Sequence, residues 1–272
     1  MECAATELEM RADSPSTPLI LEDFLQSLAL AEKSALLLDF DGTLAPFRID
    51  PSKVRPWAGV SELLCEIERT GRTRIAIVTG RPAREVALQL GVRDALEIWG
   101  LHGAERLYAD GRLEHEELAS EQQAILETCR SAIGEARLGV RVEHKRNAIV
   151  VHWRGKPAKS VQILRGRILE LFRPGSVGAE MNLLQFDGGI ELRAGQNKGD
   201  AVRKILNEIS VNTPVAYLGD DATDEDAFLA LAGRGLGVLV RREWRPSAAQ
   251  AWLHPPAQLR EFLATWLRVT QR

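Results

Sequence analysis

Two aspartates stand one residue apart at the end of an apolar run. The stretch SALLLDFDGT places Asp39 and Asp41 directly after a series of leucines. Two carboxylates in a buried place lose their hydration and repel each other, by roughly 4 kcal/mol at a separation near 4 Å and an effective dielectric near 20. We therefore expect this pair only where a cation or a reaction requires it.

Two further apolar runs are also followed by polar residues that could bind a ligand. Thr79 follows TRIAIV, and an acidic stretch follows PVAYLG. In open parallel sheets, ligands bind beyond the carboxyl ends of the strands, so the sequence predicts one common crevice. Carboxylate oxygens are the ligands that Mg²⁺ prefers, and the predicted cofactor is therefore Mg²⁺. The predicted metal ligands are Asp39, Asp41, Asp220, Asp221 and Asp224.

A phosphate group is the substrate part that fits this crevice. Thr79 and the backbone N–H groups after Asp41 can donate to phosphate oxygens, and Lys198 adds a cation at the start of a predicted helix. Asp39 is then the predicted nucleophile, which forms an aspartyl phosphate. Asp41 can protonate the departing alkoxide and later deprotonate the attacking water. The predicted catalytic residues are Asp39, Asp41, Thr79 and Lys198.

Each of these signals has a simpler explanation when it is taken alone. An Asp-x-Asp sequence also opens an EF-hand loop, but here Gly42 stands at position 4 instead of 6, and a strand replaces the required helix. The acidic stretch GDDATDED resembles a solvated turn, and Lys198 resembles a surface lysine. The glycines of GRGLGV (233–238) could suggest a dinucleotide-binding loop, but a strand follows them instead of a helix. We therefore interpret them as a helix end and turn.

The order of apolar patterns predicts an α/β fold. Continuously apolar strands alternate with helical patterns in residues 18–104 and 188–272, which indicates a doubly wound, Rossmann-like core with a parallel sheet. Residues 105–187 show hairpin signals instead, at 110–111, 145–147 and 187–189, and we interpret them as an inserted, smaller α+β cap domain. Residues 1–17 are expected to be a flexible tail.

Composition narrows the classes of partner. The net charge is −3, basic residues form no run beyond pairs such as Arg241-Arg242, and no apolar stretch reaches 18 residues. These features argue against nucleic acid and membrane as partners. The three cysteines lie far apart and the first residues form no signal peptide, so we expect a cytoplasmic protein. We also expect a monomer that acts on a small molecule.

Four motifs in this order resemble those of the haloacid-dehalogenase-like phosphatases. They are DFDGT (39–43), VTGR (78–81), NKGD (197–200) and GDDATDED (219–226). The resemblance implies the roles given above for the nucleophile, the acid/base and the two phosphate-binding residues. It also implies that Asp39, the main chain of Asp41 and Asp220 bind Mg²⁺, with Asp221 or Asp224 in support.

Longer strings resemble the trehalose-6-phosphate phosphatase family in particular. LDFDGTLAP, GLHGAE (100–105), IELR before NKG, and GDDATDEDAF carry this resemblance, which extends from about Leu36 to Leu263. The arginine-rich RREWRP is not part of it. The resemblance implies Mg²⁺-dependent hydrolysis of trehalose 6-phosphate to trehalose and phosphate.

Substrate-binding residues are predicted in both parts of the chain. Those in the cap, which could equally be the solvated face of a hairpin, would hydrogen-bond the sugar hydroxyls. The full predicted set is Gly42, Thr43, Arg81, His102, Glu105, Glu143, Lys145, His152, Arg154, Glu191 and Asn197.

Other functions stay open at this point. The same mechanism could serve sucrose phosphate, mannosylphosphoglycerate or a simple sugar phosphate. A non-catalytic sugar-phosphate sensor is disfavoured, since no carboxylate of the four motifs is missing. A phosphomutase would require a bisphosphorylated activator, and nothing in the sequence indicates one.

Overall fold

The computed structural model describes residues 17–48, 50–91, 96–173, 181–186 and 188–271. The chain forms two compact units, which we call the core unit (1–114 and 197–272) and the inserted unit (115–196). No helix among the described residues has the length and apolar character needed to cross a membrane.

An eight-stranded sheet forms the centre of the core unit, in the order β12-β11-β10-β1-β2-β3-β4-β5. The pairs from β12 to β3 are parallel, and β4 pairs with β3 in the antiparallel direction. The strands are β1 (Ser34–Leu38), β2 (Thr73–Val78), β3 (Glu97–Gly100), β4 (Glu105–Leu107), β5 (Leu113–His115), β10 (Val215–Gly219), β11 (Leu236–Val240) and β12 (Ala251–Leu253).

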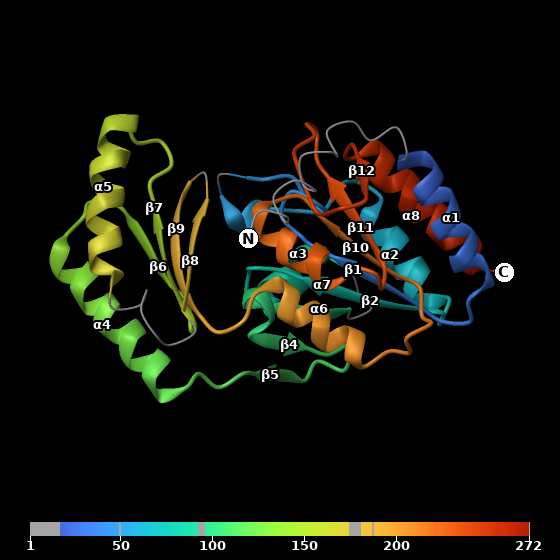
Figure 1. The fold of residues 1–272 in the computed structure, drawn as a ribbon, viewed down its shortest axis with the longest axis horizontal. Helices are drawn as coiled ribbons and strands as arrows, with labels where there is room; N and C mark the ends of the chain where they lie inside the picture. Colours follow the sequence, from blue (N-terminus) through green and yellow to red (C-terminus); the bar gives the residue numbers. More distant parts are fainter. Residues whose placement is uncertain (1–16, 49, 92–95, 174–180, 187, 272) are drawn as a thin grey trace, which may run out of the picture. The chain divides into compact units, whose positions relative to one another are not determined.

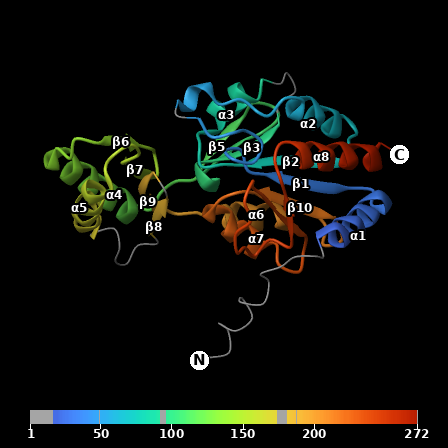
Figure 2. The same cartoon turned by 90° about the horizontal axis from the view of Figure 1, so that it is seen from above.

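Helices cover both faces of this sheet, which explains why its strands read as unbroken apolar runs. In β1, Leu36 and Leu38 pack into one hydrophobic cluster, whereas Ala35 and Leu37 pack into the other. Helices α2, α3 and α8 lie on one side of the sheet, and α6 and α7 lie on the other (Figure 2). The helices are α1 (Thr17–Leu30), α2 (Val60–Arg69), α3 (Ala83–Leu90), α6 (Lys198–Asn207), α7 (Glu225–Ala230) and α8 (Ala257–Thr270).

The inserted unit is a two-layer α+β structure. Its antiparallel sheet has the order β6-β7-β9-β8, and α4 and α5 lie against it (Figure 1). Alternate strand residues, such as Ile149, Val151 and Ile190, pack with the helices, so the polar residues between them lie on the opposite face. The elements are α4 (Ser120–Ala136), β6 (Arg141–His144), β7 (Ala148–His152), α5 (Ala158–Leu171), β8 (Met181–Phe186) and β9 (Gly189–Ala194).

The predicted fold class is confirmed, but both predicted domain junctions, at 104/105 and 187/188, lie too early in the chain. Strands β4 and β5, which we expected in the cap, extend the sheet of the core unit. Strand β9, which lies within the range 188–272 that we predicted for the core, pairs with β7 and β8 of the inserted unit. A hairpin has the same alternating pattern in the core unit and in the inserted unit, so sequence periodicity could not assign it to one of them.

Two other differences concern the ends of the core unit. Short strand β12 was not predicted, and the predicted tail, apart from Thr17, lies outside the described residues.

Candidate active site

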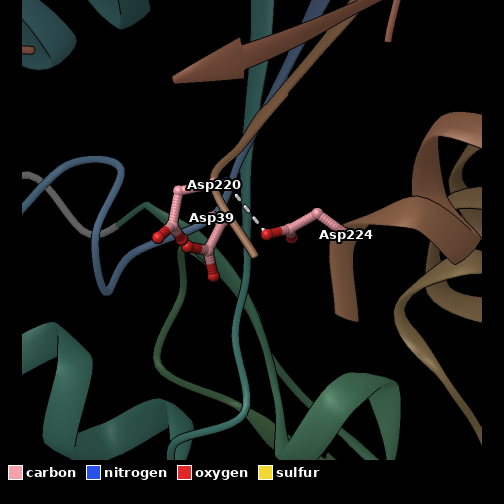
Figure 3. A group of neighbouring side chains, drawn as sticks. All are labelled: Asp39, Asp220 and Asp224. Atoms are coloured by element: carbon pink, nitrogen blue, oxygen red, sulfur yellow. Dashed lines mark hydrogen bonds between the residues drawn. The ribbon is translucent and has the colours of Figure 1, made fainter. Parts of the chain in front are cut away.

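Neighbouring parallel strands bring the predicted acidic residues together. Strands β1 and β10 are in register, with Leu38 opposite Leu218, so Asp39 and Asp220 emerge at the same edge. One carboxylate oxygen each from Asp39, Asp220 and Asp224 lie within 4.8 Å of one another, and all three residues are buried. Figure 3 shows the side chains of Asp39 and Asp220 close together on the left and that of Asp224 on the right.

Lys198 is the cation at the centre of this cluster. Its Nζ donates to Oδ1 of Asp39 at 2.6 Å and to Oδ1 of Asp224 at 2.7 Å, and only 3% of the residue is exposed. Lys198 is the first residue of α6, and a capping box fixes that start. The side chain of Asn197 accepts from the N–H of Asp200, whose carboxylate accepts from the N–H of Asn197.

Burial and mutual repulsion dominate the electrostatics of the cluster. Burial raises the pKa of Asp39 to about 7, against the lowering effect of Lys198. Burial, and then the charge of Asp39, raise the pKa of Asp220 well above its ordinary value. Burial alone would lower the pKa of Lys198, but the charges of Asp224 and Asp39 outweigh it and raise that pKa. Lys198 alone therefore does not compensate three carboxylates, and the site is suited to a further cation.

Asp39 and Asp220 fit a divalent metal ion. Oδ1 of Asp220 is buried and has no hydrogen-bond partner among the described residues, which is costly unless a cation binds it. Gly42 adopts φ +88°, and a Cβ at this position would lie 2.1 Å from Oδ2 of Asp220. The absence of a side chain at Gly42 therefore keeps space at this carboxylate. Hard carboxylate oxygens of this kind suit Mg²⁺.

Asp224 has a different environment. Its Oδ1 accepts from Lys198 and from the hydroxyl of Tyr217, at 2.7 and 2.6 Å. Its Oδ2 accepts from the N–H groups of Asp220 and Asp221, at 3.0 and 2.9 Å. A carboxylate offers about four lone-pair positions, and these four donors use them. Asp224 thus holds Lys198 and the neighbouring loop, and its predicted support of the metal ion stays a prediction.

Asp221 caps the short 3-10 helix Ala222–Asp224, because its side chain accepts from the N–H of Ala222 at 2.7 Å. Two of its neighbours in sequence, Asp220 and Asp224, are buried, whereas Asp221 is only half-buried. The described structure therefore gives Asp221 a local structural contact, and its role at a metal stays a prediction.

The acid/base candidate Asp41 forms a two-point pair with Arg81. Nε and Nη2 of Arg81 donate to the two carboxylate oxygens at 2.5 and 2.8 Å. Nη1 of Arg81 also donates to the carbonyl of Pro51 and to Glu85. Arg81, which we predicted at the substrate, is thus engaged with Asp41 and fixes the orientation of its carboxylate.

Hydroxyl groups line the same edge of the sheet. Thr79 directly follows β2 and is buried, and its Oγ1 accepts from the N–H of Arg81 at 3.2 Å. Oγ1 of Thr43 is buried and has no hydrogen-bond partner within the described ranges. The predicted phosphate-binding roles of Thr79 and Thr43 stay predictions.

His102 and Glu105 have structural contacts in the core unit. His102 has a left-handed backbone, with φ 60°, and its ring approaches Gly80, where a Cβ would lie 2.6 Å from Nε2. Oε1 of Glu105 accepts from the N–H of Ala83, the first residue of α3. The contacts of Glu105 and Asn197 are thus helix-end contacts, and their predicted substrate roles stay predictions.

The predicted sugar-binding residues of the inserted unit form two pairs. Nε2 of His152 and Oε2 of Glu143 lie 3.1 Å apart, and this hydrogen bond is the main cause that lowers the pKa of Glu143. Nζ of Lys145 lies 3.6 Å from Oε1 of Glu191, and both side chains are largely buried. Through strand register, Glu143 and Glu191 flank Val150 on the sheet face opposite the helices. Arg154 lies near Gly188.

Sequence reasoning missed two buried polar residues. In the sequence, Tyr217 stands among the apolar residues of β10 and resembles them. In the structure it is buried, and its hydroxyl donates to Asp224. Arg193 lies two residues after Glu191 on the same strand face and is 4% exposed. The period of two in IELR could have indicated Arg193, whereas no sequence signal marks Tyr217.

The fold and the site together define the class. An open parallel sheet carries an aspartate after β1, a hydroxyl after β2, a lysine at the start of α6 and aspartates after β10, as expected of the haloacid-dehalogenase-like phosphatases. The solved structure of a haloacid dehalogenase-like hydrolase from Bacteroides thetaiotaomicron shares this fold (TM-score 0.54, 15% identity, covering 81% of this chain and 93% of that one).

Within this class, the family model described as trehalose-phosphatase matches residues 37–249, and the chain belongs to this family. It is 31% identical over 263 residues to a trehalose-phosphate phosphatase of Mycobacterium marinum, covering 89% of this chain and 65% of that protein. The chain thus spans somewhat less than two thirds of that relative's length. The predicted family resemblance is confirmed.

Two solved structures are similar over nearly the whole chain. One is the C-terminal domain of a trehalose-6-phosphate phosphatase from C. albicans (TM-score 0.73, 20% identity, 92% of this chain and 96% of that one). The other is a trehalose-6-phosphate phosphatase related protein (TM-score 0.68, 28% identity, 88% of this chain and 100% of that one). Both similarities support the fold described above.

Proposed function

We propose that this protein is a Mg²⁺-dependent phosphatase that hydrolyses trehalose 6-phosphate to trehalose and phosphate through an aspartyl phosphate. The observation that carries the proposal is the buried Asp39, held by Lys198, in a member of the trehalose-phosphatase family. Beside it lies an oxygen of Asp220 that has no hydrogen-bond partner among the described residues. We include in the proposal that the protein is a cytoplasmic monomer with a small-molecule substrate.

Asp39 attacks the phosphorus atom in the first step. Lys198 binds Oδ1 of Asp39, and Oδ2 would therefore form the new P–O bond. The bond from phosphorus to the sugar oxygen breaks, and that oxygen takes a proton from Asp41. The products of this step are trehalose and the aspartyl phosphate.

Water completes the reaction in the second step. Asp41 now accepts a proton from the water, whose oxygen attacks phosphorus. The P–O bond to Asp39 breaks, which releases phosphate and restores the carboxylate. The two hydrogen bonds from Arg81 keep the Asp41 carboxylate oriented for this step.

Two groups reduce the repulsion between Asp39 and the phosphate. Lys198 is one, and its hydrogen bonds to Asp39 and Asp224 fix its position. Mg²⁺ is the other: Asp39, Asp220 and the main chain of Asp41 would hold it, and when bound it supplies positive charge against the phosphate oxygens. Thr43 and Thr79 would donate to those oxygens.

Recognition of the sugar is assigned to polar residues of the inserted unit. Glu143, Lys145, His152 and Glu191 form ion pairs and hydrogen bonds there, and such groups are suited to hydroxyl-rich ligands. A site built to hydrogen-bond hydroxyls strongly rejects analogues that lack them.

A phosphate-release assay over a panel of substrates tests this function. The panel contains trehalose 6-phosphate, sucrose phosphate, mannosylphosphoglycerate and glucose 6-phosphate. We expect kcat/KM for trehalose 6-phosphate to exceed that for glucose 6-phosphate by about 10² or more, because several hydrogen bonds of roughly 1 kcal/mol each would be lost. Equal efficiency, or a preference for sucrose phosphate, would exclude trehalose 6-phosphate as the specific substrate. No phosphate release from any compound would exclude a phosphatase.

A further inference from the structure

The arginine-rich segment after β11, which the matching motifs do not include, contacts the acidic loop. We use "acidic loop" for residues 219–225 and "arginine segment" for residues 241–248. The arginine segment starts from a fixed point: the N–H of Arg241 donates to the carbonyl of Leu253 at 3.0 Å, and its carbonyl accepts from Nε1 of Trp252 at 2.8 Å.

Two arginines of this segment bind successive carbonyl groups of the acidic loop. Nη1 of Arg241 donates to the carbonyl of Asp220 at 3.2 Å. Nη2 of Arg245 donates to the carbonyl of Asp221 at 2.8 Å. The two arginines thus hold the peptide units on either side of Asp221, next to the proposed metal ligand Asp220.

A second connection reinforces the contact. Nη1 of Arg245 pairs with Oε1 of Glu225 at 2.5 Å, and both side chains are about one-quarter exposed. Glu225 also accepts from the hydroxyl of Ser247 at 2.8 Å and from the N–H of Ala248 at 2.7 Å. The arginine segment is therefore connected to the acidic loop at its carbonyl groups and at the first residue of α7.

These contacts complement those of Asp224. Asp224 accepts from the N–H groups of Asp220 and Asp221, while the arginines donate to the carbonyl groups of the same two residues. Both main-chain polar groups of Asp220 and of Asp221 are thereby held. The direction of the Asp220 side chain follows from this backbone, because rotation of either peptide unit would break a hydrogen bond.

We propose that Arg241 and Arg245 are positioning residues that hold the acidic loop in the conformation in which Asp220 binds the metal ion. This inference rests on the proposed function, since it takes Asp220 as a ligand of Mg²⁺. The arginines have two opposing effects on metal affinity. Their positive charges weaken it, whereas the fixed loop strengthens it. Glu225 neutralises the charge of Arg245, so for Arg245 the effect of loop geometry prevails.

The sign of the effect separates positioning from simple electrostatics. If the arginines acted by charge alone, neutral variants would bind a divalent cation more tightly. If they position the loop, Arg241→Gln and Arg245→Gln bind it more weakly. Arg242→Gln is the matched control, because Arg242 is an exposed neighbour with the same charge and no recorded contact to the acidic loop within the described part of the chain.

The experiment measures Mn²⁺ binding to the full chain without substrate, by the loss of the electron-spin-resonance signal of free Mn²⁺. We expect Arg245→Gln to raise the dissociation constant by about tenfold, as loss of a hydrogen bond from a charged donor predicts, and Arg245→Lys to lie between it and the wild type. In steady-state assays, the same variants should need more Mg²⁺ for half-maximal rate and should regain most of kcat at saturating Mg²⁺. Arg242→Gln should match the wild type in both.

Other results would overturn the inference. Unchanged or tighter Mn²⁺ binding in both glutamine variants would show that the arginines do not position Asp220, while leaving the proposed phosphatase intact. No Mn²⁺ binding by the wild type would overturn both the inference and the proposed metal dependence. Thermal unfolding accompanies each measurement, and Arg241→Gln, which removes a single side-chain contact to the loop, provides the test if Arg245→Gln does not fold.

Discussion

At the scale of single residues, the site depends on how many hydrogen-bond partners each buried charge has. Lys198 neutralises parts of both Asp39 and Asp224, and Asp224 is saturated with donors. Within the described part of the chain, one buried oxygen of Asp220 has no hydrogen-bond partner. We therefore expect Asp220 to need a metal ion, and we expect Asp224, with its four donors, to organise its surroundings.

The Asp39→Asn variant tests the nucleophile. An amide is a poor nucleophile and cannot form the acyl phosphate, so we expect turnover of trehalose 6-phosphate to fall by about 10⁴-fold or more. The fold should persist, because the substitution keeps the size of the side chain and removes a buried negative charge. Single-turnover phosphate release and circular dichroism give the two readouts. Near-normal turnover would contradict the mechanism.

The Tyr217→Phe variant tests the contact that the sequence did not reveal. Burial, and then the charge of Asp224, raise the pKa of the Tyr217 hydroxyl, so it stays a donor to Asp224. Loss of this one hydroxyl should lower the free energy of unfolding by about 1 kcal/mol and reduce kcat with little effect on KM. Denaturant unfolding and steady-state kinetics measure these effects. A variant with unchanged stability and kcat would show that Asp224 does not need this donor.

Sequence could identify the residue types of the site but not their partners. Parallel strand ends and ordered motifs were enough to select Asp39, Lys198 and Asp220. Arg81 and Asn197 stand inside motifs that suggest phosphate contact, yet their side chains bind Asp41 and the start of α6. Such pairings depend on distances between segments far apart in the chain, and a single sequence contains no distances.

At the scale of elements, the start of α6 fixes the position of Lys198. Asn197 and Asp200 form the capping box, and Arg203 also pairs with Asp200 at 2.7 Å. Continuous apolar strands and helical spacing predicted α6 and β10 correctly. The assignment of the 105–115 hairpin was wrong, since its period of two fits the edge of either sheet.

Asp200→Asn tests the capping box through pH. Burial alone would raise the pKa of Asp200, but hydrogen bonds from the N–H of Asn197 and from Arg203 outweigh it and lower the pKa. A lowered pKa means that the carboxylate stabilises the fold above its unfolded pKa, near 3.9, and that this stability is lost as pH falls through the folded pKa. The variant should therefore be less stable than the wild type at pH 7, with the difference shrinking below about pH 4.

Urea unfolding from pH 3 to pH 8 measures this difference. Asn197→Ala is the companion variant, which removes the other half of the capping box and should cost about 1 kcal/mol at every pH in the range. Equal stability of Asp200→Asn and the wild type at pH 7 would show that the carboxylate contributes nothing to the start of α6.

At the scale of the whole molecule, metal binding should stabilise the core unit. Among the described residues, Lys198 is the buried counter-charge of the cluster of Asp39, Asp220 and Asp224. A ligand present at 100 times its dissociation constant stabilises a protein by roughly 2.7 kcal/mol. We therefore expect Mg²⁺ to raise the melting temperature and chelation to lower it and abolish turnover, with recovery when Mg²⁺ is added back. If millimolar Mg²⁺ changed neither the melting temperature nor the turnover rate, the proposed metal site would be contradicted.

The last prediction concerns which unit recognises the sugar and which unit carries out the reaction at phosphorus. We expect Lys145→Ala to reduce kcat/KM for trehalose 6-phosphate by about 10²-fold, because loss of Lys145 also leaves Glu191 buried without this partner. Turnover of p-nitrophenyl phosphate, which has no sugar, should change less than about threefold, since the core unit contains Asp39, Lys198 and Asp220. Lys159→Ala, an exposed lysine on α5 in the helical layer, is the matched control and should leave both substrates unaffected. Equal losses on the two substrates would show that Lys145 supports the structure and does not recognise the sugar.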